Sequence, residues 1–341
     1  MLMILKPCTI PPIIPRLEAL IRGLPSDSPT LPEILQEYSS KMRGYKGEKS
    51  LVFYLSQLSM KKYDIIHDLR LFDGEYYFQI DILILCTSFF LVLEVKNRGG
   101  EIIFERNFNQ TTLKQNNKRT RIKNPVLQAK TQARKLRKWL EDRNHPVPPT
   151  MYLFVNSKEE TVIITDTNNY EINRNICNSE GLLGKIELIE NSCQERMEAK
   201  DLKKITGLLL ANHVPDDPDI LEKFKISPKE LLSGVRCPNC HTRPMIYQRG
   251  IWYCRDCGKK SKDTHVQLIN DYFLLIKPTI TNAELCALLH ISSRKVAYTI
   301  LTSMNLPFNG ANKGRVYYAP TSPSTFRNPA NLPLNKAPCT K

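Results

Sequence analysis

Two short apolar runs that each carry charge constrain this chain more than any other feature of its sequence. The stretch FQIDILILCTSFFLVLEVKNRGG, residues 78–100, is rich in Ile, Leu, Val and Phe, yet it contains Asp81, Glu94 and Lys96. Burying a charged group in an apolar strand is costly unless that charge is paired or bound to a metal ion. The fold must therefore give these three groups partners.

The pattern around these runs predicts a domain of the α/β, or α+β, class. Short apolar segments bounded by turn residues predict strands over residues 63–72, 76–85, 89–97, 150–156 and 160–166. Hairpin-length connections make the first three strands an antiparallel meander. A helix before the meander is expected to break near Gly44 or Gly47, and a second helix is expected to open at Asn124.

The charged residues of the meander predict a divalent-metal site. Strict alternation places Gln79 and Asp81 on one face of their strand, and Glu94 and Lys96 on one face of the next. Two neighbouring carboxylates repel each other unless a cation lies between them, and hard oxygen ligands favour Mg²⁺ or Mn²⁺. Lys96 can then orient an attacking water and neutralise charge on a phosphate. The alternative is a salt-bridged edge strand, with Lys96 merely paired to Glu94. Gln79 is either a site-lining amide or a cross-strand hydrogen-bonding residue.

These motifs resemble a known nuclease family. Asp81, followed after twelve residues by the Glu-Val-Lys triplet 94–96, resembles the PD-(D/E)XK nucleases, with Ile80 where the family label has proline. The pieces GYKGEKSLVFYLSQL, QID, LEVKNRGGEI and NPVLQAKTQARKL narrow the resemblance to the NERD (nuclease-related) domain, over roughly residues 40–165. The resemblance implies a restriction-endonuclease-like core, in which a mixed central sheet is flanked by helices.

The same resemblance implies roles for further residues. Glu48 would be another metal ligand or a carboxylate behind the ligands, and Gln128 would face the site, although it can equally be a solvated helix residue. The implied reaction is phosphodiester hydrolysis, with one or two divalent ions held by Asp81, Glu94 and the backbone carbonyl of Val95. The candidate catalytic residues are Glu48, Asp81, Glu94, Lys96 and Gln128.

A basic segment follows the candidate site. Residues 99–123 are expected to form a further hairpin and a basic loop. From Arg106 to Arg143 there are twelve Lys and Arg residues and two acidic ones, a local charge of +10. Such a surface beside a nuclease site favours contact with phosphates, with salt-dependent affinity, whereas the alternative is a plain solvated face. The candidate contacts are Lys118, Arg119, Arg121, Arg134 and Lys135.

Four cysteines predict a structural zinc site. Cys237-x2-Cys240 is followed, after thirteen residues, by Cys254-x2-Cys257, a spacing that suits tetrahedral Zn²⁺ bound by four thiolates in a zinc ribbon. A redox pair is the alternative. His241 can compete as a ligand, but the four cysteines complete the site without it. Basic and aromatic residues in this module favour nucleic acid over protein as its partner.

The last part of the chain resembles a helix-turn-helix. TNAELCALLHISSRKVAYTILTSMNLPF predicts two helices joined by a tight turn, and FNGANKGRVYYAP predicts a wing hairpin. Arg294 and Lys295 would then lie on the recognition helix and contact nucleic acid. A packing or dimerisation role is the alternative.

The expected organisation is modular. The predicted parts are an extended proline-rich arm (1–32), a nuclease domain (33–213), a linker (214–234), the zinc ribbon (235–262), the winged-helix-like module (263–320) and a disordered tail (321–341). No signal peptide and no apolar run of ~18 residues is found, so a cytoplasmic protein without membrane association is expected.

The net charge of +15 indicates a polyanionic partner. We therefore expect a metal-dependent nuclease, with DNA favoured over RNA only because such modules more often serve DNA. The rival hypotheses are a nucleic-acid-binding protein that uses the nuclease fold as a non-catalytic platform, and a protein-binding signalling scaffold.

Overall fold

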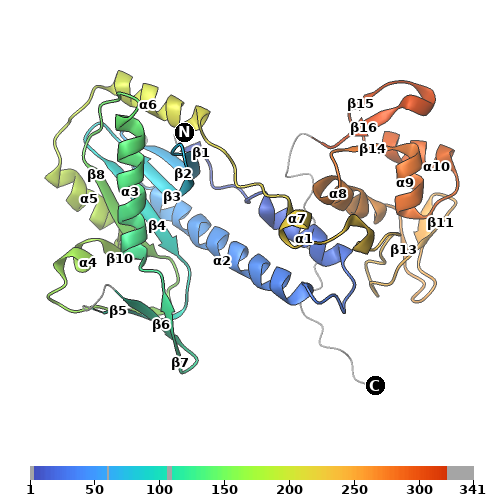
Figure 1. The fold of residues 1–341 in the computed structure, drawn as a ribbon, viewed down its shortest axis with the longest axis horizontal. Coiled ribbons are helices and arrows are strands. Elements are labelled where there is room, and N and C mark those ends of the chain that lie inside the picture. The colour runs from blue at the N-terminus through green and yellow to red at the C-terminus, as the bar shows by residue number, and fades with distance from the viewer. Residues whose placement is uncertain (1–3, 60, 106–109, 321–341) are drawn as a thin grey trace. The chain divides into compact units, whose positions relative to one another are not determined.

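The computed structural model describes residues 4–59, 61–105 and 110–320 of the chain (Figure 1). The tail 321–341, expected to be disordered, lies outside the described residues. The chain divides into two compact units, and neither is a continuous stretch of sequence. Unit 1 combines residues 1–10 with 40–216, and unit 2 combines 11–39 with 217–341. The module boundaries expected from the sequence remain predictions.

Unit 1 is built on a mixed six-stranded sheet, as the resemblance implies. Its order is β1 (Ile4–Lys6), β2 (Asp64–Phe72), β3 (Tyr77–Leu85), β4 (Phe90–Lys96), β8 (Thr150–Asn156) and β10 (Ile176–Asn178). The pairs β2–β3 and β3–β4 are antiparallel, which confirms the predicted meander. The outer pairs β1–β2, β4–β8 and β8–β10 are parallel.

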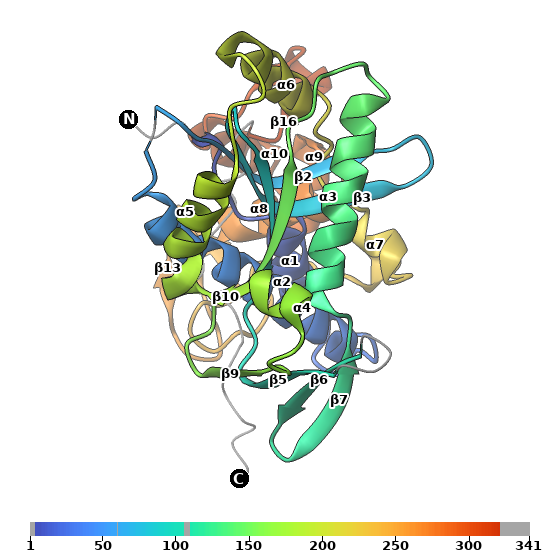
Figure 2. The same ribbon diagram turned by 90° about the vertical axis from the view of Figure 1, so that its left-hand side faces the viewer.

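Helices cover both faces of this sheet (Figures 1 and 2). The helices of unit 1 are α2 (Leu31–Leu55, from residue 40 onward), α3 (Pro125–Glu141), α4 (Tyr170–Arg174), α5 (Leu182–Ser192) and α6 (Ala199–Ala211). Apolar residues of α3 and α6 share one core cluster with the sheet, and those of α2 and α5 share another. The expected break in α2 near Gly44 or Gly47 is wrong, because the helix runs through both glycines without interruption.

A second sheet corrects another expectation. Its order is β7 (Lys118–Ile122), β6 (Thr111–Gln115), β5 (Gly100–Phe104) and β9 (Thr161–Ile164). The segment expected to be a basic loop is therefore the hairpin β6–β7. Its turn residues Asn116 and Asn117 have φ of 50° and 58°. Two positive φ values in a two-residue turn match the right-handed twist of the flanking strands, and Asn tolerates this conformation well.

The N-terminal segment is not an extended arm over residues 13–23, where it forms helix α1 (Ile13–Gly23). Pro15 lies in the first turn, where a missing backbone N–H breaks no helical hydrogen bond. Helix α1 is anchored to α8 (His265–Leu275) by a buried ion pair. The Arg22 guanidinium donates to both carboxylate oxygens of Asp271, at 3.0 and 2.6 Å.

In unit 2 the ribbon shares one hydrophobic core cluster with the helices that follow it in the chain. The remaining elements of unit 2 are α7 (Ile220–Lys223), β11 (Ile246–Gln248), β12 (Ile251–Tyr253), β13 (Lys260–Ser261), β14 (Thr279–Thr281), α9 (Asn282–Leu289), α10 (Arg294–Ser303), β15 (Phe308–Asn309) and β16 (Val316–Tyr318). The fully buried Trp252 packs in this core and donates its indole N–H to His265 Nδ1 at 2.9 Å. The ribbon strands and the helices therefore stabilise one another.

Over the described part of the chain, no helix combines the length and the apolar character needed to cross a lipid bilayer.

Candidate functional site

Strands β3 and β4 separate where the charged residues begin. Their ladder ends at the pair Ile82 and Leu93, although both strands continue beyond it. Beyond that pair, the Asp81 side chain replaces a backbone partner, because its Oδ2 accepts a hydrogen bond from the backbone N–H of Val95 at 2.8 Å. The Asp81 carboxylate thus lies against the backbone between Glu94 and Lys96.

The neighbouring strand β2 is irregular at the same level. The register places Asp68 opposite Asp81, but the pair completes no ladder contact, and Asp68 has φ of 51°. Strict alternation of β3 is consequently wrong here: Ile80 and Ile82, expected on one face, belong to different core clusters. The irregularity adds a third carboxylate, that of Asp68, which the sequence reasoning did not single out.

The Glu94 carboxylate of β4 disfavours the charged form of Asp81 on β3. Burial raises the pKa of Asp81, and the nearby Glu94 carboxylate raises it further, while Lys96 lowers it. Glu94 is only 6% exposed, and its Oε1 is ion-paired with Lys96 Nζ. Bringing a second positive charge between Asp81 and Glu94 would relieve this repulsion.

Glu48 of α2 belongs to the same group. Burial raises the pKa of Glu48, and so do the carboxylates of Asp81 and Asp68. Gly47 brings the helix close, because a Cβ on this residue would lie 2.7 Å from Asn97 Cβ and 2.8 Å from Ser157 Oγ. The helix can therefore deliver Glu48 to the ends of β4 and β8 only if residue 47 has no side chain.

Lys6 lies beside the group, where no sequence signal pointed to it. Its Nζ donates to the carbonyl oxygens of His67 and Asp68, both at 2.9 Å, and lies 3.4 Å from Asp68 Oδ2. Gln79 donates to Asp68 Oδ1 at 2.5 Å, which places this amide at the edge of the group. Asp68 itself had only a weak signal, as one of two acids, with Asp64, in the predicted strand YDIIHDLRLF.

The donor set of this group fits a hard divalent cation. Asp81 and Glu94 offer carboxylate oxygens, and Mg²⁺ is typically held by one or two protein carboxylates together with waters and substrate phosphates. Among the described residues, only the four cysteines form a set of three or more His, Cys, Asp or Glu ligand atoms that all lie within 4.8 Å of one another. No three carboxylates of this group converge in this way among the described residues.

Gln128 lies elsewhere on the surface of unit 1. It occupies the first turn of α3 and lines a hollow of about 700 Å³ together with Arg121, Lys123 and Gln132. Within the described ranges it makes no hydrogen bond to the carboxylate group. The structure thus brings Glu48, Asp81, Glu94 and Lys96 together, and it places Gln128 with basic residues instead.

The basic segment is partly neutralised by acids from elsewhere in the chain. Arg119 pairs with Glu105 at 2.7 Å, and Lys135 pairs with Asp73 at 3.0 Å. Other pairs are Lys114–Glu101, Lys130–Glu171 and Arg137–Glu141. The side chains of Lys118, Arg121 and Arg134 are exposed. A charge count over residues 106–143 leaves out acidic partners that lie elsewhere in the sequence. The effective local charge is therefore lower than the count of +10 indicates.

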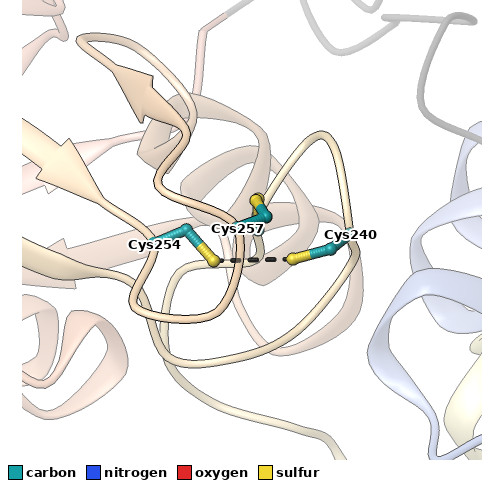
Figure 3. Close-up of side chains that lie close together, drawn as sticks. Cys240, Cys254 and Cys257 are labelled. Atoms are coloured by element: carbon teal, nitrogen blue, oxygen red, sulfur yellow. Dashed lines mark hydrogen bonds between the residues drawn. The ribbon is translucent and has the colours of Figure 1, made fainter.

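The four cysteines of the ribbon converge as their spacing predicted. Figure 3 shows three of them, Cys240, Cys254 and Cys257. Sγ of Cys237 lies 3.6 Å from that of Cys257, and Sγ of Cys240 lies 3.5 Å from that of Cys254. A tetrahedral ion with Zn–S bonds of about 2.3 Å separates its sulfurs by about 3.8 Å, whereas a disulfide needs about 2.05 Å. The cluster therefore fits zinc.

The surroundings of the cluster shift the thiol pKa values in both directions: burial raises the pKa of Cys237, and hydrogen bonds lower the pKa values of Cys254 and Cys257. The Thr242 hydroxyl lies 3.0 Å from Sγ of Cys240 and 3.5 Å from Sγ of Cys254. Its hydrogen bond is the main cause that lowers the pKa of Cys254. His241 is not part of the four-residue set, in line with a site that the cysteines complete.

The last helices and strands carry an exposed basic and aromatic surface. Helix α9 ends at Leu289 and is followed by His290, which is left-handed with φ of 57°, and the Ser293 side chain caps α10. Arg294 and Lys295 follow in the first turn of α10 and are exposed. Just before β16, the Arg315 guanidinium lies 4.2 Å from the ring centre of Phe308. These elements form two helices and a hairpin in the order that the sequence predicted.

Comparison with known proteins identifies the central part of unit 1. Residues 43–156, about a third of the chain, match the family model of the nuclease-related domain (NERD). No curated protein and no solved structure matches the chain. The matched segment includes all five candidate catalytic residues, from Glu48 to Gln128, and lacks both the ribbon and the last helices. The chain therefore contains a nuclease-related domain.

Proposed function

We propose that this protein is a metal-dependent nuclease that hydrolyses phosphodiester bonds in nucleic acid, with DNA favoured as substrate. One observation carries the proposal. Asp81 and Glu94 share the separated end of β3 and β4 with Lys96 and with Glu48 of α2, inside the matched domain. Carboxylates held close together in a partly buried site repel one another, and a bound cation relieves this repulsion.

Each residue of the group has a distinct task in this proposal. Asp81, Glu94 and the backbone carbonyl of Val95 would hold Mg²⁺ or Mn²⁺, which polarises a phosphate and lowers the pKa of a bound water. Lys96 Nζ, held by Glu94, would donate hydrogen bonds to the attacking water and to phosphate oxygens. Glu48 would be a further ligand or would accept a hydrogen bond from a water of the ion.

The remaining parts would hold the nucleic acid. Exposed basic residues of unit 1 would contact phosphates, and so would α10 of unit 2. In this proposal the zinc ion is structural, since it fixes the ribbon on which nearby basic and aromatic side chains are displayed. The proposed phosphate contacts are Lys118, Arg119, Arg121, Arg134, Lys135, Arg294 and Lys295.

Cleavage assays with matched variants test the proposal. The purified protein should cut plasmid or single-stranded DNA with Mg²⁺ or Mn²⁺, and EDTA should stop the reaction. Asp81→Asn and Lys96→Met should each reduce the rate by about 10²-fold or more. Lys200→Met is the control, because this α6 side chain is 66% exposed and lies outside the proposed site.

Two other outcomes would replace the proposal. Salt-sensitive binding to DNA or RNA without cutting, under every metal tested, would favour a non-catalytic platform. Absence of salt-sensitive binding to both would favour a protein-binding scaffold.

A further inference from the structure

Three arginines of unit 2 line one cavity beside the cysteine cluster. The cavity has a volume of about 790 Å³, and its walls come from the end of α1, the first turns of α2 and the ribbon. Arg22, Arg236 and Arg243 line this arginine cavity, and all three also line an adjacent cavity of about 30 Å³. Because guanidinium groups bind carboxylates and phosphates through paired N–H donors, the arrangement indicates an anionic ligand.

A single carboxylate balances these three positive charges. Asp271 accepts two hydrogen bonds from Arg22, and Gln267 Nε2 donates to its Oδ1 at 3.0 Å. Of the described residues that line the two cavities, Asp271 alone is acidic. Since Asp271 neutralises Arg22, the charges of Arg236 and Arg243 are in excess. Charges that are partly removed from water favour the binding of an opposite charge.

The two excess guanidinium groups have unused N–H donors. Arg243 donates to three backbone carbonyl oxygens, each at 3.0 Å, which fixes its plane but leaves its Nε without a described partner; these are the oxygens of Arg22, Leu232 and Gly234. Within the described ranges, the Arg236 side chain has neither a hydrogen bond nor an ion pair. Burial and the Arg22 charge lower the pKa of Arg236, in line with a group that lacks a close acid. Arg236 and Arg243 are only partly buried, so a ligand that enters the cavity can reach them.

The zinc site offers another partner for this charge, because an ion held by four thiolates carries two negative charges. Yet no described guanidinium donates a hydrogen bond to a cysteine sulfur. The sulfurs are contacted instead by the backbone N–H of Asn239, 3.4 Å from Sγ of Cys237, and by the Thr242 hydroxyl. The arginine donors are therefore left for a ligand in the cavity.

The shape and charge of the cavity favour the end of a strand over its middle. The anion must enter the cavity to reach both Arg236 and Arg243. An internal phosphodiester is tied to the chain on both sides and carries one charge, whereas a terminal phosphate is tied on one side and carries nearly two at pH 7. The volume lies within the ~300–1,000 Å³ of small-molecule sites, and three leucines offer apolar contacts to the attached nucleoside: Leu24, Leu31 and Leu35.

We propose that the arginine cavity binds the terminal phosphate of a nucleic-acid strand, whose oxygens accept hydrogen bonds from Arg236 and Arg243. The choice of a strand as the carrier of this phosphate rests on the proposed function, and it specifies a substrate with a phosphorylated end. A free mononucleotide carries the same phosphate monoester and is distinguished by the test.

Binding of oligonucleotides that differ only at their ends tests this proposal. Zinc-loaded full-length protein is titrated with short oligothymidylates that carry a phosphate at the 5′ end, at the 3′ end or at neither. Each strand is labelled on an internal base. Mg²⁺, Mn²⁺ and chelators are omitted, so that no strand is cut and zinc stays bound. A phosphate at one of the two ends should strengthen binding about tenfold over the strand with two hydroxyl ends.

Competition identifies the carrier of the phosphate. The unlabelled phosphorylated strand should displace the labelled one at a much lower concentration than thymidine monophosphate or inorganic phosphate does. Equal competition by thymidine monophosphate would overturn the assignment to a strand and make a free nucleotide the ligand.

Matched variants assign the preference to the cavity. Arg236→Gln should abolish the preference for the phosphorylated end and change the affinity for the hydroxyl-ended strand much less. Arg249→Gln is the control, because this exposed arginine lies between β11 and β12 and lines neither cavity. It should keep the preference. Elemental analysis checks that both variants retain zinc.

Hydrogen exchange of the unmodified protein locates the phosphate without any substitution. The phosphorylated strand should protect the backbone amides of residues 21–26 and 236–244 more than the hydroxyl-ended strand does. If Arg236→Gln loses zinc and this added protection is absent, the arginine serves the zinc site and the proposal fails.

The remaining outcomes separate this site from the nuclease proposal. Equal affinities for the three strands, or a preference that persists in zinc-loaded Arg236→Gln, would overturn the phosphate site. An end-phosphate preference without any metal-dependent cleavage would retain this site while removing the nuclease.

Discussion

At the residue scale, two glycines of α2 with the same local conformation have opposite surroundings. A Cβ on Gly47 would collide with Asn97 and Ser157, whereas a Cβ on Gly44 would meet nothing within 4 Å. The sequence predicted a helix break at one of them, because glycine disfavours helices. That expectation could not include the close approach of the helix to the sheet, which is a tertiary requirement.

Alanine substitution should separate these two cases. Gly44→Ala should stabilise the protein by about 0.5–1 kcal/mol through helix propensity. Gly47→Ala should destabilise it by about 1–3 kcal/mol, because the added carbon overpacks the contact with Asn97. Urea unfolding measures both changes. Equal stabilisation by the two substitutions would show that the helix does not approach the sheet as described.

His67 predicts an acid sensitivity of unit 1. It is fully buried, and neither ring nitrogen has a hydrogen-bond partner among the described residues. Burial, assisted by Lys6, lowers the pKa of His67 to about 4. Below about pH 6.5, His67 binds a proton in the unfolded chain but not in the folded chain. Stability is therefore lost as the pH falls from about 6.5 to 4.

The loss assigned to His67 should reach about 3 kcal/mol at pH 4. His67→Leu should flatten this part of the pH profile, since leucine cannot bind the proton and leaves no unpaired nitrogen. Hydrogen exchange of the β3 amides between pH 7 and 4.5, corrected for intrinsic rates, isolates unit 1 from His265 of unit 2, whose pKa burial also lowers to about 4. An unchanged profile in the variant would assign the sensitivity to other groups.

At the element scale, local sequence signals predicted the meander and α3 well. The Asn124 side chain caps α3, as its position before proline indicated, and accepts from the backbone N–H groups of Val126 and Leu127. The signals failed for α1, where prolines suggested an extended chain. They also failed for the hairpin β6–β7. Its many basic residues suggested a loop, and the pair Asn116–Asn117 was not interpreted as a hairpin turn.

The hairpin β6–β7 offers a test of the phosphate-binding surface. Arg121 is exposed, whereas Arg119 is already paired with Glu105. Arg121→Gln should weaken nucleic-acid binding and reduce the slope of log affinity against log salt by about 1. Arg119→Gln should have a smaller effect, because the ion pair with Glu105 already neutralises part of the Arg119 charge. Titrations at several salt concentrations measure both slopes, and a larger effect of Arg119→Gln would contradict this account.

At the scale of the whole molecule, the sequence located the cysteine module and the last helices but not their common core. Cys237 and Cys254 belong to the same buried cluster as Trp252, Ile269 and Leu301. Contacts between residues far apart in the chain create this core, and no sequence window contains them. The likeness to a nuclease-related domain was readable, since its charged residues lie on adjacent elements.

Removal of zinc should therefore destabilise all of unit 2 and not the ribbon alone. Elemental analysis should find one zinc ion per chain. Chelation, or Cys254→Ser, should increase hydrogen exchange in α8, α9 and α10 as well as in the ribbon strands, while β2–β4 of unit 1 keep their protection. Loss of protection confined to residues 235–262 would show that the ribbon folds independently.

The outer strands β1 and β10 have a consequence for anyone who excises the matched segment. A fragment cut at residues 43 and 156 would start after Lys6 and stop before Ile176, which removes the neighbours of β2 and β8. Both would then present bare backbone amides and carbonyls, ready to recruit strands from other molecules. Insolubility of such a fragment would report two missing strands, and not an inherently unstable domain.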